Sequence, residues 1–439
     1  LTGRTEVAAT EFVGYQTLES SARILAVLQQ QEPVDRAEAG SQAVVILDRT
    51  PFYAEGGGQL GDTGLLCTGD GAVVFQVEDT VATVDGVYLH RGTVQQGEVR
   101  SGLTVVARVE APRRLAIMRH HTATHLLHRA LKNVLGDHVN QAGSLVAPDY
   151  LRFDFTHLEA LSPADLAAIE DQVNDQILRN LPVQAFFTSR EAARQAGAIA
   201  LFGEKYAEEV RVIKIGDYSM ELCGGTHVEA TGTIGLFKIL SESSVGSGVR
   251  RIEAVAGTAA LHWVRRLNTT IQTLADRLRT SPDQVVARVE ELEERLTTTQ
   301  RELKRLYQRL AQVEAEHLLA QADHWAGVRI VVGQVNVPDM EALRTVGDAL
   351  KARLESGVLL LGLQRGERVN FLCMATEEVV RRGFHAGRLI GEVARIAGGG
   401  GGGRPHMAQA GGTRPERLQE ALEKGRSLIK EQLAAGHDG

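Results

Sequence analysis

The chain has 439 residues, 43% of them hydrophobic and 23% charged, and its formal net charge is −7. At about 100–200 residues per domain, this length predicts two to four domains with an ordinary globular composition. The negative charge argues against a polycation that coats nucleic acid, although a local basic patch can still bind RNA. Three widely spaced cysteines and no apolar run of membrane length argue against a disulfide framework and a membrane span, so we expect a cytoplasmic protein.

Residues 1–110 are predicted to form a small antiparallel β barrel or sandwich. Short segments of alternating apolar and polar residues are separated by turn signals such as Asp85-Gly86. Many short strands with such turns are typical of this architecture. The strands are expected at residues 43–47, 72–77 and 103–109.

Residues 111–256 mix helices and strands, which predicts an α+β domain. Pro112 opens a helix that extends to about residue 134, and Gly136 stops it. A second helix is expected at residues 163–180, with Ser162 as its N-cap. Further strands are expected at 209–215, 234–241 and 249–256.

Residues 257–325 carry apolar side chains at intervals of three and four, the a/d pattern of a coiled coil. A break at 280–283 divides the pattern into two seams, which predicts an antiparallel helical hairpin. Residues 326–439 predict a further α/β domain. Its strands are expected at 328–332, 358–362 and 370–375, and its helices at 340–354, 384–396 and 415–433. The fold class is therefore an α+β multidomain protein.

Two pairs of residues in the second region predict a metal site. His121 and His125 lie at positions i and i+4 of the expected helix, so both imidazoles project from one face. Cys223-Gly224-Gly225-Thr226-His227 supplies a thiolate and a third imidazole around two flexible glycines. Three nitrogens and one sulfur suit tetrahedral Zn²⁺.

Each pair alone is more often a surface or core feature than a metal site, but both pairs in one domain favour a metal. His128, at i+7 from His121, lies on roughly the same helix face, whereas His120 points about 100° away. Four protein ligands usually mark a structural zinc, because catalytic zinc keeps a position open. The sequence leaves open whether zinc activates water or anchors substrate.

Residues 50–59 read Thr-Pro-Phe-Tyr-Ala-Glu-Gly-Gly-Gly-Gln, a glycine-rich loop that can approach a ligand and offer backbone N–H groups. Together with the metal motifs, this loop resembles the editing half of alanyl-tRNA synthetases. The resemblance covers nearly the whole chain. It is carried by residues 50–59, 119–127, 220–227, 232–242, 248–257 and the Gly-Gly-Gly-Arg-Pro-His-Met-Ala-Gln-Ala-Gly-Gly segment at 401–412.

The resemblance implies hydrolysis of the ester in Ser-tRNA(Ala) and Gly-tRNA(Ala). An alanine pocket cannot exclude smaller glycine, and rejecting an added hydroxyl is worth only a few kcal/mol, so a second sieve is needed. It also implies that His121, His125, Cys223 and His227 hold zinc and that Gln59 is the active-site glutamine. We expect Gln59 and backbone amides to position water and stabilise the oxyanion, so Gln59→Ala should keep zinc and lose rate. Thr50 is our candidate for sensing the serine hydroxyl.

The C-terminal glycines are expected to belong to a tRNA-binding domain. Six glycines alone more often form a linker, but Arg404, Arg414 and Arg417 follow, and a glycine loop beside a helix N-terminus can hold phosphate. We therefore expect Gly402, Gly403, Arg404 and Arg414 to contact tRNA. Arg250 and Arg251 are candidates for phosphate contacts near the acceptor end, or for ion pairs with Glu253.

Two departures and three alternatives accompany the resemblance. The aminoacylation domain is absent from this sequence, which starts at Leu1, so we expect a segment excised from a synthetase that does not activate alanine. His120 and His406 replace residues that are often Asn and Asp in the family. A free-standing editing protein of the AlaX type, a threonyl-tRNA synthetase editing domain and a non-catalytic tRNA-binding scaffold are the alternatives. A homodimer through the hairpin or the C-terminal domain is also open.

Overall fold

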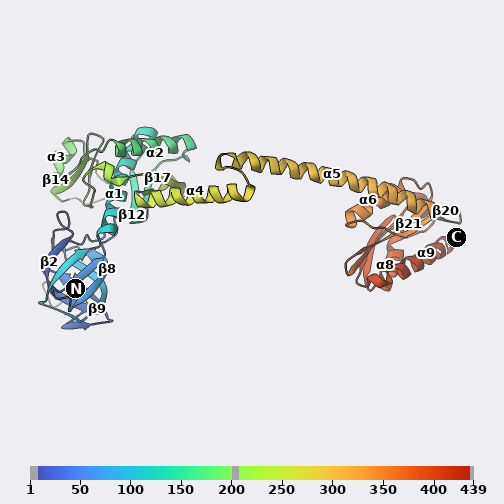
Figure 1. Cartoon of the computed structure of the whole chain (residues 1–439), viewed down its shortest axis with the longest axis horizontal. Coiled ribbons are helices and arrows are strands. Elements are labelled where there is room, and N and C mark those ends of the chain that lie inside the picture. Colours follow the sequence, from blue (N-terminus) through green and yellow to red (C-terminus); the bar gives the residue numbers. More distant parts are fainter. Residues whose placement is uncertain (1–7, 200–206, 436–439) are drawn as a thin grey trace. The chain divides into compact units, whose positions relative to one another are not determined.

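A computed structural model of the chain describes residues 8–199 and 207–435. The chain divides into two compact units, Leu1–Thr273 and Leu274–Gly439, which are described separately (Figure 1). Among the described residues, no helix is long and apolar enough to cross a membrane.

The first part of the first unit is a closed antiparallel barrel, which confirms the sequence prediction (Figure 1). The sheet closes because β11 pairs with both β7 and β2. Closure leaves no open edge, and inward side chains such as Ile24, Val45 and Phe75 are fully buried. The barrel strands in chain order are β2 (Glu19–Gln29), β5 (Gln42–Leu47), β7 (Gly64–Cys67), β8 (Val74–Ala82), β9 (Tyr88–Gln96) and β11 (Thr104–Val109). Short strands accompany them: β1 (Glu11–Phe12), β3 (Glu32–Val34), β4 (Arg36–Glu38), β6 (Arg49–Thr50) and β10 (Glu98–Arg100).

Helix α1 (Ala111–Leu135) connects the barrel to the rest of the unit. Pro112 lies in its first turn and Gly136 is its C-cap, as the sequence predicts. In that first turn, the buried Arg114 makes a bidentate ion pair with Asp62, and its guanidinium also donates to the carbonyls of Gly14 and Pro51 at 2.9 Å each. The beginning of α1 is therefore fixed to barrel loops by a buried, fully paired charge.

The α+β part of the first unit packs α1 and α2 (Pro163–Leu178) against an antiparallel sheet in the order β12-β13-β18-β17. Ser162 caps α2 in a capping box with Asp165. A second sheet has the order β14-β15-β16. The remaining bounds are β12 (Gln141–Val146), β13 (Leu151–Thr156), β14 (Val183–Ser189), α3 (Arg190–Gln195), β15 (Glu209–Ile215), β16 (Ser219–Leu222), β17 (Phe237–Gly246) and β18 (Val249–Ala256). The strand expected from residue 234 begins later, because Thr231–Ile234 forms the 3₁₀ turn η1.

Helices α4 (Thr258–Leu278) and α5 (Val285–Ala320) carry the two predicted seams, and the short η2 (Pro282–Gln284) lies in the predicted break. On α5, seam residues such as Leu296, Leu306 and Val313 are exposed. Because the division between the two units falls within α4, antiparallel pairing of the helices stays a prediction.

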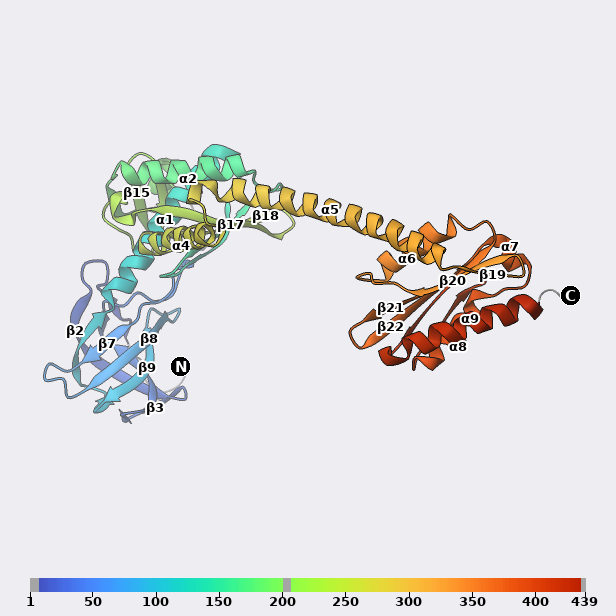
Figure 2. The same cartoon turned by 45° about the vertical axis from the view of Figure 1, so that its right-hand side comes forward.

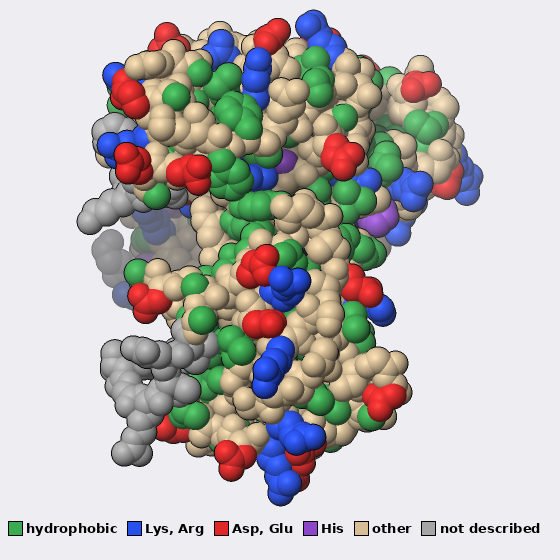
Figure 3. All heavy atoms as spheres, turned by 90° about the vertical axis from the view of Figure 1, so that its left-hand side faces the viewer, with side chains coloured by type: hydrophobic (Ala, Val, Ile, Leu, Met, Phe, Trp, Pro, Cys, Tyr) green, Lys and Arg blue, Asp and Glu red, His purple; other side chains and the backbone are tan. Residues whose placement is uncertain are grey.

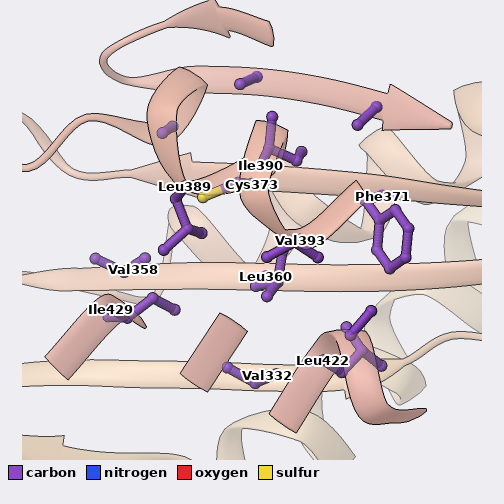
Figure 4. Close-up of a cluster of buried hydrophobic side chains, with 14 of the residues drawn as sticks. Val332, Val358, Leu360, Phe371, Cys373, Leu389, Ile390, Val393, Leu422 and Ile429 are labelled. Carbon is purple, nitrogen blue, oxygen red and sulfur yellow. The ribbon is translucent and has the colours of Figure 1, made fainter. Parts of the chain in front are cut away.

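The second unit is a six-stranded mixed sheet in the order β19-β20-β21-β22-β24-β23, with helices on both faces (Figure 2). Alternate residues of each strand face opposite sides. Val358, Leu360 and Phe371 face α8 and α9 (Figure 4), whereas Leu359 and Leu361 face α6 and the end of α5. The bounds are β19 (Asp323–Trp325), β20 (Val328–Gln334), α6 (Met340–Lys351), β21 (Gly357–Arg365), β22 (Arg368–Ala375), α7 (Glu377–Arg381), α8 (Ala386–Ile396), β23 (Gly400–Arg404), β24 (Met407–Gly412), η3 (Pro415–Arg417) and α9 (Leu418–Ala435).

The glycine run differs from the loop that the sequence predicts, since Gly400–Arg404 forms the exposed edge strand β23. It pairs with β24, and this close approach leaves no room for side chains: a Cβ on Gly401 would lie 2.3 Å from Ala410 Cβ. A Cβ on Gly402 would meet open space. The glycines therefore permit tight strand packing on one side and expose bare backbone on the other.

Candidate metal centre

The structure brings the four predicted ligands together. His121 and His125 come from the middle of α1, and Cys223 and His227 come from the loop that follows β16. Their ligand atoms all lie within 4.8 Å of one another. Cys223 Sγ is 3.4 Å from His121 Nε2 and 3.3 Å from His227 Nε2. These separations are close to the edge of about 3.5 Å that zinc–nitrogen and zinc–sulfur bonds span in a tetrahedron.

The buried polar atoms fit a metal better than an apolar core. His125 Nε2 faces the other three ligand atoms and has no hydrogen-bond partner among the described residues. An unpartnered buried nitrogen is costly, and coordination to a metal would satisfy it. Three imidazoles and a thiolate are a donor set that zinc accepts.

Each ligand histidine has its other nitrogen held by a different acceptor. His121 Nδ1 donates to Gln59 Oε1 at 2.7 Å and His125 Nδ1 donates to Glu221 Oε2 at 2.7 Å. His227 Nδ1 lies 3.1 Å from Thr122 Oγ1, which itself donates to the Met118 carbonyl and so accepts from the imidazole. These bonds direct all three Nε2 atoms towards the centre, as outer partners of metal-bound histidines do.

Glu221 is a functional residue that the sequence reasoning missed. Its carboxylate is 2% exposed and also accepts from His128 Nδ1 at 3.1 Å. Burial raises the pKa of this carboxyl, but His125 and His128 outweigh burial and hold the pKa well below its usual range. Glu221 lies in β16 two residues before Cys223, which directly follows the strand, and both residues line the same cavity. That spacing was the signal available in the sequence.

The charges of the cluster compensate one another. Burial lowers the pKa of His125, but Glu221 and Cys223 outweigh burial and raise it to about 10. Burial raises the pKa of the Cys223 thiol, but the three ligand histidines lower it well below its ordinary value. Burial and the neighbouring His121 lower the pKa of His227 to about 3. The Cys223 thiolate and the neutral His227 are in the states that bind a metal, whereas His125 would have to release its proton before it coordinated one.

The Cys-Gly-Gly loop is held by hydrogen bonds that its three consecutive carbonyls accept. Arg211 Nη1 donates to Cys223 O at 3.0 Å and to Gly225 O at 2.7 Å, and the hydroxyl of Tyr15 donates to Gly224 O at 2.5 Å. The guanidinium also lies 4.0 Å from the Tyr15 ring centroid. Gly225 must lack a side chain, because a Cβ there would lie 2.0 Å from His121 Cε1.

The two neighbouring histidines have other roles. His120 Nε2 accepts from the Ala256 N–H at 3.0 Å, its Nδ1 bonds the Ala116 carbonyl, and burial lowers its pKa to about 4. His128 contacts Glu221 and packs on Phe153, with its Nε2 unpartnered among the described residues. His120 therefore packs helix against strand, and His128 supports the carboxylate.

A cavity of about 220 Å³ opens beside the cluster. Its lining includes His121, His125 and Cys223 of the cluster and Tyr53, Gly56 and Gly57 of the barrel loop. The other lining residues are the polar Thr124, Gln141 and Ser144, Phe153, and the neighbours of Cys223, namely Glu221, Leu222, Gly224 and Gly225. Gln141 Nε2 donates to Ser144 Oγ at 3.1 Å. The sequence reasoning did not single out these three polar residues.

The two predicted catalytic residues occupy different positions. Gln59 is fully buried against the cluster and does not line the cavity. Thr50 is fully buried in the barrel, where its Oγ1 lies 2.7 Å from His90 Nε2 and accepts from the Phe52 N–H. Thr50 also lies outside the cavity lining.

The predicted tRNA contacts are spread over both units. Arg250 pairs with Glu242, and Arg251 makes a bidentate pair with Asp154 at 2.7 and 2.8 Å, so both are ion-paired, but not with Glu253. In the second unit, Arg414 packs near Gly398, whereas Arg404 lies at the other end of β23 opposite Met407. On the face in Figure 3, basic and acidic side chains are interspersed.

Three known families match parts of the chain. The family described as tRNA synthetases class II (A) matches residues 3–113, and the second additional domain of threonyl and alanyl tRNA synthetases matches residues 210–253. The DHHA1 domain matches residues 327–431. The second match contains Cys223 and His227.

Curated alanine–tRNA ligases match almost the whole chain. The enzyme of Acetivibrio thermocellus is 49% identical over 97% of this chain and 48% of its own length. That of Pelotomaculum thermopropionicum is 48% identical over 98% of this chain and 49% of its own length. The chain thus spans about half the length of these relatives. A solved C-Ala domain from the Aquifex aeolicus alanyl-tRNA synthetase is 29% identical, covering 26% of this chain and 96% of that one, with a TM-score of 0.23.

Proposed function

The chain belongs to the alanine–tRNA ligase family, and from that premise we propose that it hydrolyses the ester of tRNA(Ala) wrongly charged with serine or glycine. The observation that carries this proposal is a small cavity walled by three of the four residues of a zinc-type cluster. A closed structural zinc site would not need an adjoining cavity. The identity of the substrate, tRNA(Ala) charged with serine or glycine, is inferred from the resemblance in sequence.

We propose that the aminoacyl group enters this cavity with its ester next to the cluster. Thr124, Gln141 and Ser144 offer hydrogen-bonding groups to the serine hydroxyl and the amino group, while the volume of about 220 Å³ suits a small side chain. Thr124 Oγ1 donates to the His120 carbonyl, so it can act towards a substrate only as an acceptor. Thr50 stays our candidate for serine sensing, acting from within the barrel.

The backbone N–H of Gly57 is our candidate for contacting the oxyanion, because Gly57 lines the cavity whereas the Gly56 N–H already donates to Gln59 O. A zinc ion held by His121, His125, Cys223 and His227 would supply positive charge that polarises the ester or anchors the adenosine end. Glu221, the one carboxylate in the lining, is engaged by two histidines. We therefore propose that a bound water or a ribose hydroxyl carries the proton.

The test measures zinc content and Ser-tRNA(Ala) hydrolysis on the same preparations. Cys223→Ala should lower both, whereas Gln141→Leu should keep zinc and reduce the rate by about 100-fold, as loss of one oriented polar group can do. Normal hydrolysis by zinc-free Cys223→Ala would contradict the proposal that the reaction depends on zinc. A zinc-loaded wild type that leaves Ser-tRNA(Ala) intact would favour the scaffold with structural zinc.

We further propose that the second unit binds tRNA(Ala) through the bare edge of β23. Gly402 and Gly403 are exposed on this edge strand, where alternate backbone N–H groups point away from β24, and Arg404 adds a charge that has no ion-pair partner among the described residues. Arg404→Ala and Arg414→Ala should each weaken tRNA binding and reduce its salt dependence by about one phosphate contact. Filter binding over a salt series measures this, and an unchanged slope contradicts it.

For Arg250 and Arg251, the phosphate role must compete with Glu242 and Asp154. Arg251→Lys keeps the charge and removes the bidentate pair with Asp154, and Arg250→Lys keeps the charge without the Nε contact to Glu242. Unchanged tRNA binding in a lysine variant would support the phosphate role, since that role needs only the charge. The exposed seam of α5 supports a homodimer, which sedimentation of the full chain would detect. We expect the protein in the cytoplasm with its tRNA.

A further inference from the structure

Every polar side-chain atom of Gln59 is already bonded within the protein. Oε1 accepts from His121 Nδ1 at 2.7 Å and from the Thr226 N–H at 2.9 Å. Nε2 donates to Thr226 Oγ1 at 2.9 Å. The side chain thus touches one ligand on α1 and the neighbour of another in the Cys-Gly-Gly-Thr-His loop.

The loop that carries Gln59 is fixed to β12. The Gly56 N–H donates to Gln59 O at 3.1 Å and the Gln59 N–H donates to Gly56 O at 3.0 Å, which closes a tight turn. Val146 bonds Gly58 and Leu60 on either side of Gln59. Gly57 and Gly58 have φ of 58° and 82°, and a Cβ on Gly58 would lie 2.3 Å from Ser144 Oγ. The backbone of Gln59 therefore has little freedom to turn its amide elsewhere.

A second residue from the same N-terminal region reaches the metal loop. The Tyr15 hydroxyl donates to the Gly224 carbonyl, and its ring supports Arg211. Tyr15 and Gln59 therefore touch the loop at two points, while neither supplies a ligand. Both come from the part of the chain that precedes α1.

We propose that Gln59 is a positioning residue through which the barrel sets the geometry of the metal cluster, and that it does not touch the substrate. Holding His121 Nδ1 fixes the ring and presents Nε2 to the metal, and holding Thr226 fixes the residue beside His227. The consequence for hydrolysis rests on the proposed function. The consequence for zinc affinity does not.

The experiment measures zinc affinity of the full chain by competition with a chromophoric chelator. Gln59→Leu removes both hydrogen bonds that Gln59 Oε1 accepts. We expect the zinc affinity to fall by about 10–100-fold, the range for the loss of a residue that hydrogen-bonds a metal ligand. The absorption spectrum of the cobalt-substituted protein should change as well, because His121 is no longer oriented. Gln59→Glu keeps the two acceptor bonds and should restore most of the affinity and the cobalt spectrum.

The matched control is Gln141→Leu, the same change on the cavity wall. It should keep the wild-type zinc affinity and cobalt spectrum while lowering the hydrolysis rate. If Gln59→Leu behaves like this control, Gln59 contacts substrate and the proposal is overturned. A wild type that binds zinc without hydrolysing Ser-tRNA(Ala) would overturn the proposed function and leave the zinc measurements to decide the role of Gln59.

Tyr15→Phe is a second variant that keeps the proposal testable if the Gln59→Leu protein does not fold. It removes one hydroxyl from a partly exposed side chain and leaves the cavity unchanged. We expect the zinc affinity to fall several-fold. This decrease is smaller than that for Gln59→Leu, because Tyr15 does not contact a metal ligand. With Gln59→Leu unfolded, wild-type zinc affinity in both Tyr15→Phe and a Gln59→Ala variant would overturn the proposal.

Discussion

The barrel interior and the metal cluster both bury histidines, yet the two environments act on the imidazole in opposite directions. His90 lies in the barrel with no exposed surface, and burial lowers its pKa to about 4. His125 is 6% exposed, and despite its burial Glu221 and Cys223 raise its pKa to about 10. Burial is therefore similar, and the neighbours decide the charge.

The difference lies in what each histidine is bonded to. His90 bonds the Val45 carbonyl and the Thr50 hydroxyl, both neutral, so a proton on the ring would be an unpaired buried charge. His125 donates to a carboxylate and faces a thiolate. In the barrel, the histidine is a neutral packing group. In the cluster, a carboxylate and a thiolate lie close together, and a cation would balance their negative charge.

The largest effect should come from crowding the cluster itself. Gly225→Ala places a Cβ 2.0 Å from His121 Cε1 and 2.8 Å from Gln59 Oε1, so the ligand must move. We expect zinc affinity to fall by about 100-fold. Gly224→Ala is the control, because a Cβ there meets nothing within 4 Å. Equal affinities in the two variants would show that the loop adapts freely.

Removing the charge that distinguishes His125 from His90 should have a slightly smaller effect. Glu221→Gln keeps the shape and loses the carboxylate, so we expect zinc affinity to fall by roughly 30-fold. Chelator competition measures the change, and Glu242→Gln, whose carboxylate pairs with Arg250 instead, is the control. Unchanged affinity in Glu221→Gln would mean that orientation, not charge, is what Glu221 contributes.

Because His90 is neutral and buried in the barrel, we expect the stability of the folded protein to fall at acidic pH. Above its ordinary pKa of 6.5, His90 is neutral in both the folded and unfolded chain. As the pH falls from 6.5 towards 4, the unfolded chain takes up a proton that the folded barrel refuses, so stability is lost. Between pH 6.5 and 5.5 this amounts to about 1 kcal/mol. Urea unfolding of His90→Gln, a neutral mimic, should show a correspondingly shallower pH dependence than the wild type.

The smallest effect concerns the partner of His90. Thr50→Val removes the hydroxyl that bonds His90 Nε2, and we expect the free energy of unfolding to fall by about 1 kcal/mol. The same variant tests the predicted serine sensing, through the ratio of Ser-tRNA(Ala) to Gly-tRNA(Ala) hydrolysis. A ratio that collapses would confirm the role that the sequence predicts, and an unchanged ratio would confine Thr50 to the barrel.

The four candidate ligands could be named from the sequence because residue type and spacing carry that information. The residues around them could not, since their roles depend on contacts between distant segments. Gln59 was identified as functional, but only the fold places it 2.7 Å from His121 Nδ1. Thr122 adjoins His121 in sequence, yet nothing there reveals that its hydroxyl meets His227. Gln141 and Ser144 enter the cavity because β12 pairs with β13 and carries the barrel loop.

The elements were predicted well where periodicity is strong. The barrel, α1, α2 and the central strands of the second unit all appear near their expected positions. The glycine run failed as a loop because glycine has no side-chain pattern to read. Only the partner strand, with Ala408 and Ala410 packed against it, makes Gly400–Arg404 a strand.

The buried Arg114 makes the length of the first two turns of α1 as important as their composition. His121 follows Arg114 by seven positions, which is close to two helical turns, so both side chains lie on the same side of the helix. One inserted residue between them would turn the ligands by about 100° relative to the barrel and its glutamine. Across divergent sequences, this segment should therefore keep its length, with neither insertions nor deletions.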